Sequence, residues 1–366
     1  MMVWLPTCST PPPFLATFWS LLMKVSRSSS TITSLSMKKS GSAATVPLGA
    51  VLLSFSASSL RSASLRHSFN SCGSVGCMSI APSLLAFKES DGWGWKPAFL
   101  ALALFSAIWA PYRLLSGAIA SRFSYHALMY VDMVVKPSVT LAVIALSARV
   151  FKLGSIRGVL AKIGLKLKAI PPGVAIGTLA HLLYNATAIA LKLAADWSGD
   201  VRIELSISHY SVLNMAYMLA VVGVFEELLD RGFIQTNIAV SARRKAGILG
   251  LILSIVATGF FFSLLHIPID VFVRKLPPYA IATHLGYTFS FSLAAGSLYF
   301  ATDLNIIACA VMHGLENTGY PLRVYTGGRI VDPTLLEFSA SSIICLIMML
   351  TAASLYSRRC SMQPPS

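Results

Sequence analysis

Charged residues are scarce in this sequence. Only 12% of its 366 residues are Asp, Glu, Lys or Arg, whereas soluble domains average about 25%. Hydrophobic residues make up 55%, so the composition excludes an ordinary soluble domain and indicates an integral membrane protein. The formal net charge of +15 does not indicate nucleic-acid binding, because the basic residues lie between apolar runs and in the N-terminal region. We expect no nucleic-acid partner.

Cysteine provides no framework for the fold. The six cysteines are scattered along the chain, at Cys8, Cys72, Cys77, Cys309, Cys345 and Cys360. Their spacing matches neither a disulfide-stapled domain nor a zinc-binding pattern. Stability must therefore come from helix packing.

Acidic residues are absent from residues 1–88, which are rich in Ser and carry Arg. This composition is typical of an organellar transit peptide. Two further interpretations stay open: an over-extended gene start, with the protein beginning near Met78, or short membrane segments at 14–23 and 46–55. Both segments are shorter than the ~20 residues of a spanning helix. We expect no packed fold in 1–88.

Apolar runs long enough to cross a bilayer follow one another from residue 93 onward. The predicted spans are 95–120, 127–151, 171–195, 210–240, 247–267, 279–301, 305–320 and 335–356. Residues 152–168 carry five basic side chains and no acid, which favours an interfacial helix. The sequence therefore predicts an all-α, multi-pass membrane bundle of about eight spans over 93–357, with a tail at 358–366.

The charges of the connecting loops predict an orientation. Basic residues gather at 152–168, 243–245 and 358–359, whereas the loop 196–204 is acidic. Since cytoplasmic loops are enriched in Lys and Arg, we expect both ends of the membrane domain in the cytoplasm and the acidic loop outside. In a prokaryote the membrane would be the plasma membrane.

A charged cluster, Glu226, Glu227, Asp230 and Arg231, interrupts the span 210–240. Each charge facing lipid at the bilayer centre costs ~2.5–3.5 kcal/mol, so the cluster must face a protein-lined cavity. Glu227 and Arg231 are four residues apart with the acid first, the favourable order for an ion pair. Glu226 points about 100° away, and its neighbour four residues on is another acid. Glu226 therefore lacks a partner, which suits a general base. The competing interpretation is a structural ion pair between helices.

Later spans carry further polar residues. Phe262 and His266 are four residues apart, as are His313 and Asn317. Gathering these side chains in one cavity is the least costly way to satisfy them inside a membrane. His284 has no such companion and is interpreted as structural.

One earlier span also contains a pair of charges. Asp132 and Lys136 lie four residues apart within 127–151. Residues at this spacing share a helix face. They are therefore predicted to pair with each other, before Pro137.

Three motifs in order resemble those of the CPBP family of intramembrane proteases, which includes the CAAX prenyl endopeptidases and the Abi bacteriocin-immunity proteins. The motifs are Glu226-Glu227-x-x-x-Arg231, Phe262-x-x-x-His266 and His313-x-x-x-Asn317. The Gly-Ser-Leu-Tyr stretch at 296–299 is also family-like, and the resemblance covers roughly 154–320. Asp230 departs from the aromatic or apolar residue usual before the Arg.

The resemblance implies a four-helix catalytic core around an intramembrane cavity and a role for each motif residue. Glu226 and His266 would activate a water molecule, and His313 and Asn317 would donate hydrogen bonds to the oxyanion. Glu227 and Arg231 would hold the site, with Phe262 packed beside His266. Glu316 would either fix the tautomer of His313 or face another helix.

The function implied by the resemblance is that of an endopeptidase that needs no cofactor. It would cleave near the C-terminus of a hydrophobic or prenylated peptide or protein, with membrane lipid as its surroundings. Glu226, His266 and His313 also supply the two-His-one-carboxylate set of a catalytic zinc site, although no His-Glu-x-x-His is present. A non-catalytic immunity or scaffold protein and a transporter with a buried ion pair are also compatible with these residues.

Overall fold

The computed structural model describes residues 82–120, 122, 125–197, 199–205, 212–318 and 322–361. The three interpretations offered for the acid-free region 1–88 are not tested, because residues 1–81 lie outside the described residues. No packed fold was expected anywhere in 1–88. Residues 82–88, however, do pack against the membrane domain. Leu84 and Phe87 are buried in the main apolar core, and the Phe87 ring meets that of Trp93 edge-on at 4.5 Å.

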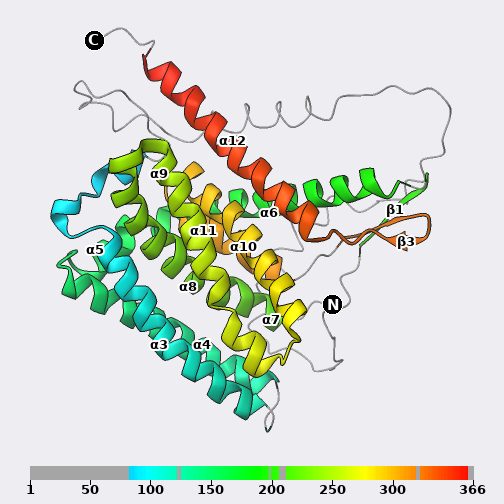
Figure 1. Ribbon diagram of the computed structural model, residues 1–366, viewed down its shortest axis with the longest axis horizontal. Coiled ribbons are helices and arrows are strands. Elements are labelled where there is room, and N and C mark those ends of the chain that lie inside the picture. Colours follow the sequence, from blue (N-terminus) through cyan, green and yellow to red (C-terminus); the bar gives the residue numbers. More distant parts are fainter. Residues whose placement is uncertain are drawn as a thin grey trace.

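The long helices lie where the apolar runs predict them. They are α3 (Trp95–Ala120), α4 (Tyr125–Val150), α6 (Ile170–Ala195), α9 (Thr236–Leu264), α10 (Pro278–Ala301), α11 (Ile306–Thr318) and α12 (Leu335–Ser361). In Figure 1, α3 and α4 run side by side along one flank, and α12 crosses α6 and α10 on the opposite side. The described part of the chain is thus a helix bundle.

Four stretches of the described residues are long and apolar enough to cross a membrane. They are Trp95–Ala118, Ala127–Val150, Ile156–Ala195 and Val212–Val273. The last has 62 residues, far more than the ~20 of a single crossing. The predicted number of eight spans stays a prediction, whereas an integral membrane protein is well supported.

Gly247 divides the longest of these stretches. Its φ of 53° lies in the left-handed region, which glycine adopts without steric cost. Here α9 breaks into two helical parts that fold closely together, since an added Cβ at Gly250 would lie 2.2 Å from the carbonyl oxygen of Ala242. The basic turn predicted at 243–245 lies at this bend.

The segment that carries the charged cluster is not a uniform α-helix. After α7 (Val212–Tyr217), a π-helical segment η5 (Met218–Gly223), the short α8 (Val224–Glu227) and a second π-helical segment η6 (Leu228–Gln235) follow without a break. π-Helical turns inside α-helices are frequent at functional sites. The two acidic residues therefore lie between two local irregularities of the same helix.

Short elements connect the long helices. The basic stretch 152–168 forms α5 (Ile156–Lys162) and the 3₁₀ turn η4 (Leu167–Ala169) rather than one interfacial helix. Ser155 caps α5 by accepting a hydrogen bond from the Gly158 N–H at 3.2 Å. Further along, the Asn305 side chain caps α11 by accepting from Ile307 N at 3.0 Å and Ala308 N at 3.3 Å.

A small antiparallel sheet corrects the all-α prediction. Strand β1 (Val201–Leu205) pairs with β2 (Leu322–Thr326), which pairs with β3 (Arg329–Ile330). The acidic loop therefore contains an edge strand. The pairing joins the chain after α6 to the chain after α11, so the sheet lies outside the helical bundle (Figure 1).

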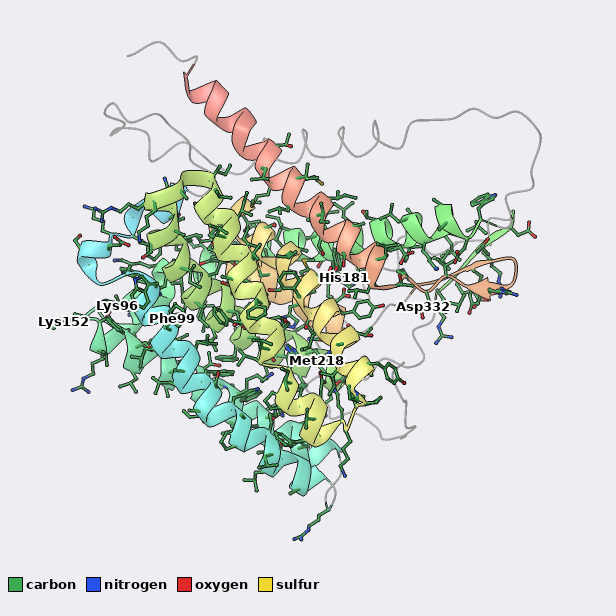
Figure 2. The ribbon with its side chains drawn as sticks, in the orientation of Figure 1. Lys96, Phe99, Lys152, His181, Met218 and Asp332 are labelled. Carbon is green, nitrogen blue, oxygen red and sulfur yellow. The ribbon has the colours of Figure 1, made fainter. Side chains whose placement is uncertain are left out.

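Charged side chains lie at both ends of the bundle. Figure 2 shows Lys96 and Lys152 at one end and Asp332 near the sheet at the other, and all three side chains are exposed. Between the ends, apolar side chains cover the outer faces, for example Phe99 on α3, Val134 on α4 and Leu253 on α9. An apolar belt between polar ends is the surface that a bilayer requires.

Candidate functional site

Close helix packing brings the acidic cluster against α11. An added Cβ at Gly223 would lie 2.3 Å from the carbonyl oxygen of Ala310, and one at Gly314 would lie 2.7 Å from the Cα of Leu219. Small residues let membrane helices approach in this way. Because Gly223 and Gly314 are close in sequence to Glu227 and His313, their contacts place these two side chains face to face.

Glu227 is the centre of the site and is completely buried. Its Oε2 accepts a hydrogen bond from Arg231 Nε at 2.9 Å, and its Oε1 lies 2.8 Å from Nδ1 of His313. The pair predicted between Glu227 and Arg231 is therefore present. The guanidinium also lies over the ring of Phe262, 5.1 Å from its centroid.

Glu226 has a partner that the sequence-based interpretation missed. Lys136 of α4 donates to its Oε1 in a buried ion pair, so the expectation of an acid without a counter-charge is wrong. The second oxygen, Oε2, lies 3.6 Å from Nε2 of His313. The Glu226 side chain is 18% exposed, which leaves it accessible to a small molecule.

The predicted ion pair between Asp132 and Lys136 is also wrong. Asp132 instead binds Arg113 of α3, whose Nη1 lies 3.0 Å from Oδ2, and it accepts hydrogen bonds from Tyr112 and from Tyr217 Oη, the latter at 3.0 Å. The same Arg113 nitrogen also donates to Oδ1 of Asp132 at 3.2 Å. Asp132 is thereby engaged across helices, and Lys136 is left to Glu226.

His313 lies between the two carboxylates. For Nδ1 to donate to Glu227, this nitrogen must carry a proton, so Glu227 orients the ring. Glu316 faces α6, where its Oε2 lies 3.2 Å from His181 Nδ1 and 3.0 Å from Asn185 Nδ2. Of the two roles considered for Glu316, the structure favours the one in which it faces another helix.

His266 lies just beyond the C-terminal end of α9, next to the same cluster. Its Nδ1 lies 2.9 Å from the carbonyl oxygen of Phe262, to which it can donate, leaving Nε2 as a proton acceptor. The Phe262 ring lies 4.8 Å from the His266 ring and 5.6 Å from the His313 ring. Phe262 thus packs beside His266, as predicted, and separates the two imidazoles.

A second polar group adjoins His266. Nδ1 of His284 lies 2.6 Å from Oδ2 of the fully buried Asp270, and Arg274 contacts the second carboxylate oxygen at 3.1 Å. The rings of His266 and His284 are 5.4 Å apart. The interpretation of His284 as structural overlooked Asp270, which lies in the π-helical segment η7 (Ile269–Val273) after α9 and gave no motif signal.

Asn317 and Asp230 belong to the same motifs but are not among the hydrogen-bonded residues described above. Asn317 is partly buried one turn beyond His313 on α11, on the face that its four-residue spacing predicts. Asp230 is buried, and its Oδ1 has no hydrogen-bond partner among the described residues. The sequence correctly marked Asp230 as unusual.

The donor set does not favour a metal centre. Among the described residues, no three His, Cys, Asp or Glu side chains converge as ligands for a metal ion. Lys136 contacts Oε1 of Glu226, and Nδ1 of His313 is hydrogen-bonded to Glu227. These two atoms are therefore already engaged within the protein. The zinc hypothesis stays a prediction that a chelator can test.

An apolar cavity of about 290 Å³ lies between α3 and the end of α9. Its lining includes Trp109, Phe261, Leu265 and Pro268. Leu265 and Pro268 flank His266 in sequence, and the Trp109 ring lies 5.2 Å from Nζ of Lys136. An apolar chain could therefore lie next to the polar cluster.

Comparison with known proteins agrees with the motifs. Residues 208–319 match the family described as type II CAAX prenyl endopeptidase Rce1-like. A comparison with curated proteins found no match. The matched segment contains Glu226, Glu227, Phe262, His266 and His313, together with Asn317 and Arg231. The match over this segment supports the resemblance to the CPBP family, which includes the CAAX prenyl endopeptidases.

Proposed function

We propose that this protein is an intramembrane endopeptidase of the CAAX-processing type, which cleaves near the C-terminus of a hydrophobic or prenylated peptide or protein. The observation that carries the proposal is the convergence of Glu226, Glu227 and His313 in one partly accessible cluster within the segment that matches the family. His266 adjoins this cluster through Phe262.

Glu226 and His266 would act as the base. The Oε2 atom of Glu226 and Nε2 of His266 are the acceptors that the surrounding contacts leave available. A water molecule between them would lose a proton as its oxygen attacks the scissile carbonyl carbon. Collapse of the tetrahedral intermediate would break the C–N bond, and the same proton would pass to the leaving amine.

His313 and Asn317 would stabilise the oxyanion. Since the Nδ1 proton of His313 is directed at Glu227, Nε2 can donate only from the imidazolium form, whose charge the flanking carboxylates offset. Preorganised donors of this kind usually supply the largest electrostatic share of acyl-transfer catalysis. Asn317, one turn further along α11, would be the second donor.

The apolar cavity supports a hydrophobic substrate. Apart from Ser106, the cavity is lined by apolar side chains, including Leu102 and Leu264. Burial of each CH₂ group of a bound chain contributes about 0.8 kcal/mol. A prenylated peptide should therefore bind more tightly than the same peptide without its lipid.

The proposal is tested by purifying the protein in detergent and incubating it with prenylated and unprenylated peptides, with and without a chelator. We expect cleavage that survives the chelator, is lost in Glu226→Ala and His266→Ala, and falls about 10²–10³-fold in Asn317→Ala. Lys152→Ala, a change at the exposed end of the bundle, serves as the control. Undiminished cleavage by Glu226→Ala would refute the mechanism. Binding without cleavage by the wild type would favour an immunity or scaffold protein, and loss of activity with the chelator would favour zinc.

A further inference from the structure

The charges of the family motif do not balance by themselves. Glu226, Glu227 and Asp230 are three acids within one turn of helix, and Arg231 is the single cation among them. Removing an ion from water costs several kcal/mol unless a partner compensates for it. A second cation is therefore needed in the cluster. Apart from Arg231, the motifs contain no Lys or Arg that could supply it.

Lys136 supplies that cation from a different part of the chain. It lies on α4, outside residues 208–319 that match the family. Its side chain is only 3% exposed, and lysine is almost never so buried unless it is paired. Its ammonium group contacts Oε1 of Glu226 and lies over the Trp109 ring.

The surroundings of Lys136 direct it to Glu226. The nearest acid on its own helix, Asp132, already accepts hydrogen bonds from Arg113, Tyr112 and Tyr217. The guanidinium of Arg113 lies over the same Trp109 ring, 4.1 Å from its centroid. The helix pair α3–α4 is thus built to present one ammonium group to the site.

We propose that Lys136 is a positioning residue for the reaction, which acts through Glu226; this inference rests on the proposed function. Lys136 holds Oε1, which fixes the carboxylate so that Oε2 faces Nε2 of His313, 3.6 Å away. One carboxylate oxygen, Oε1, is thereby held by Lys136, and the other, Oε2, is left to bind the attacking water. Without the ammonium group, the carboxylate can rotate, and the water is no longer held in line with the scissile carbonyl.

The experiment compares two charge-removing changes on the same helix. Lys136→Met removes the ammonium from Glu226 but keeps an unbranched apolar chain, and Lys136→Arg restores a cation. Asp132→Asn is the matched control, because Asp132 is similarly buried, at 4% exposed against 3% for Lys136, and its ion partner is Arg113 rather than Glu226. All variants are purified in detergent, the folded fraction is quantified, and kcat and KM are measured on the prenylated peptide.

We expect Lys136→Met to lower kcat per folded molecule on the order of 10²-fold, the effect of misplacing a reacting group by about 1 Å, with KM almost unchanged. Lys136→Arg should recover a substantial part of the loss. Asp132→Asn should lower the yield of folded protein while its folded fraction keeps the wild-type kcat. If Lys136→Met does not fold, Lys136→Gln replaces it, with a loss of kcat also expected.

Three results would overturn the inference alone: cleavage by the wild type together with an unchanged kcat in Lys136→Met, no recovery in Lys136→Arg, or an equal loss of kcat in Asp132→Asn. Absence of cleavage by the wild type would instead refute the proposed function, and this inference with it. The two failures are therefore distinguishable from the wild-type measurement.

Discussion

Arg231 has a larger share in stability than the exposed cations of this chain. It is fully buried, it donates to Glu227, and its Nη1 and Nη2 have no hydrogen-bond partner among the described residues. Removing one partner of a buried ion pair typically costs about 3–5 kcal/mol. We expect Arg231→Ala to lower the thermal midpoint and the folded yield in detergent strongly. Arg244→Ala is the control, because its ion pair with Glu89 is exposed and is worth about 0–1 kcal/mol. Equal losses in the two variants would contradict this assignment.

At this scale, sequence spacing finds partners within one helix and misses partners on another. Glu227 and Arg231 are four residues apart, and their pairing could be predicted. Glu226 and Lys136 are 90 residues apart, and Asp132 offered Lys136 a closer partner in sequence. The tertiary packing that engages Asp132 with α3 has no local signal. Spacing alone would also predict that Glu226→Gln leaves folding unchanged, but in the structure this change deprives the buried Lys136 of its counter-charge.

The contact between η5 and α11 depends on the absence of a side chain at Gly223. An added Cβ there would lie 2.3 Å from the carbonyl oxygen of Ala310, so Gly223→Ala must push the two segments apart. We expect a loss of stability of about 1–3 kcal/mol, as for overpacking in a core. We also expect reduced kcat, since the shift separates Glu227 from His313.

Gly158→Ala is the control for this prediction. Gly158 lies in the first turn of α5, where an added Cβ would meet only the Ser155 Oγ, at 3.2 Å. Alanine has the higher helix propensity by about 1 kcal/mol, so this variant should be neutral or slightly stabilised. Thermal unfolding and peptide cleavage of both variants decide the matter: a Gly223→Ala protein as stable and active as wild type would show that the helices do not need this close approach.

Hydropathy predicted a helix well where an apolar run extends over its whole length. The predicted span 95–120 coincides with α3 (Trp95–Ala120), because an unbroken apolar run leaves the chain no other way to satisfy its backbone in lipid. The sheet was missed because β1 and β2 are short and pair across a gap of more than a hundred residues. The π-helical segments were missed because they arise from packing rather than from any residue type.

For the whole molecule, the separation of charge between the two ends is a prediction from the sequence. The basic loops counted along the chain predict one end, and Lys96 and Lys152 lie together there (Figure 2). Composition alone thus predicts a membrane protein with a basic and an acidic side. It does not predict which distant helices meet, and the polar cluster around Glu226 depends on such a meeting, between α4, α8 and α11.

Truncation tests where the folded molecule begins. The sequence predicts that the region before Glu89 is dispensable, whereas Leu84 and Phe87 pack in the core, and Ser83 donates to Asp303 from its N–H at 2.8 Å and its hydroxyl at 2.7 Å. A chain that begins at Met78 keeps these contacts and should insert, fold and unfold at the wild-type temperature. A chain that begins at Glu89 loses two buried side chains, worth about 1.5–3 kcal/mol each, and should unfold at a lower temperature. The Met78 chain carrying Leu84→Ala and Phe87→Ala is the matched control and should reproduce most of that loss. If the Met78 chain itself fails to fold, residues before it are required; if the Glu89 chain matches wild type, the packing of residues 82–88 adds nothing to stability.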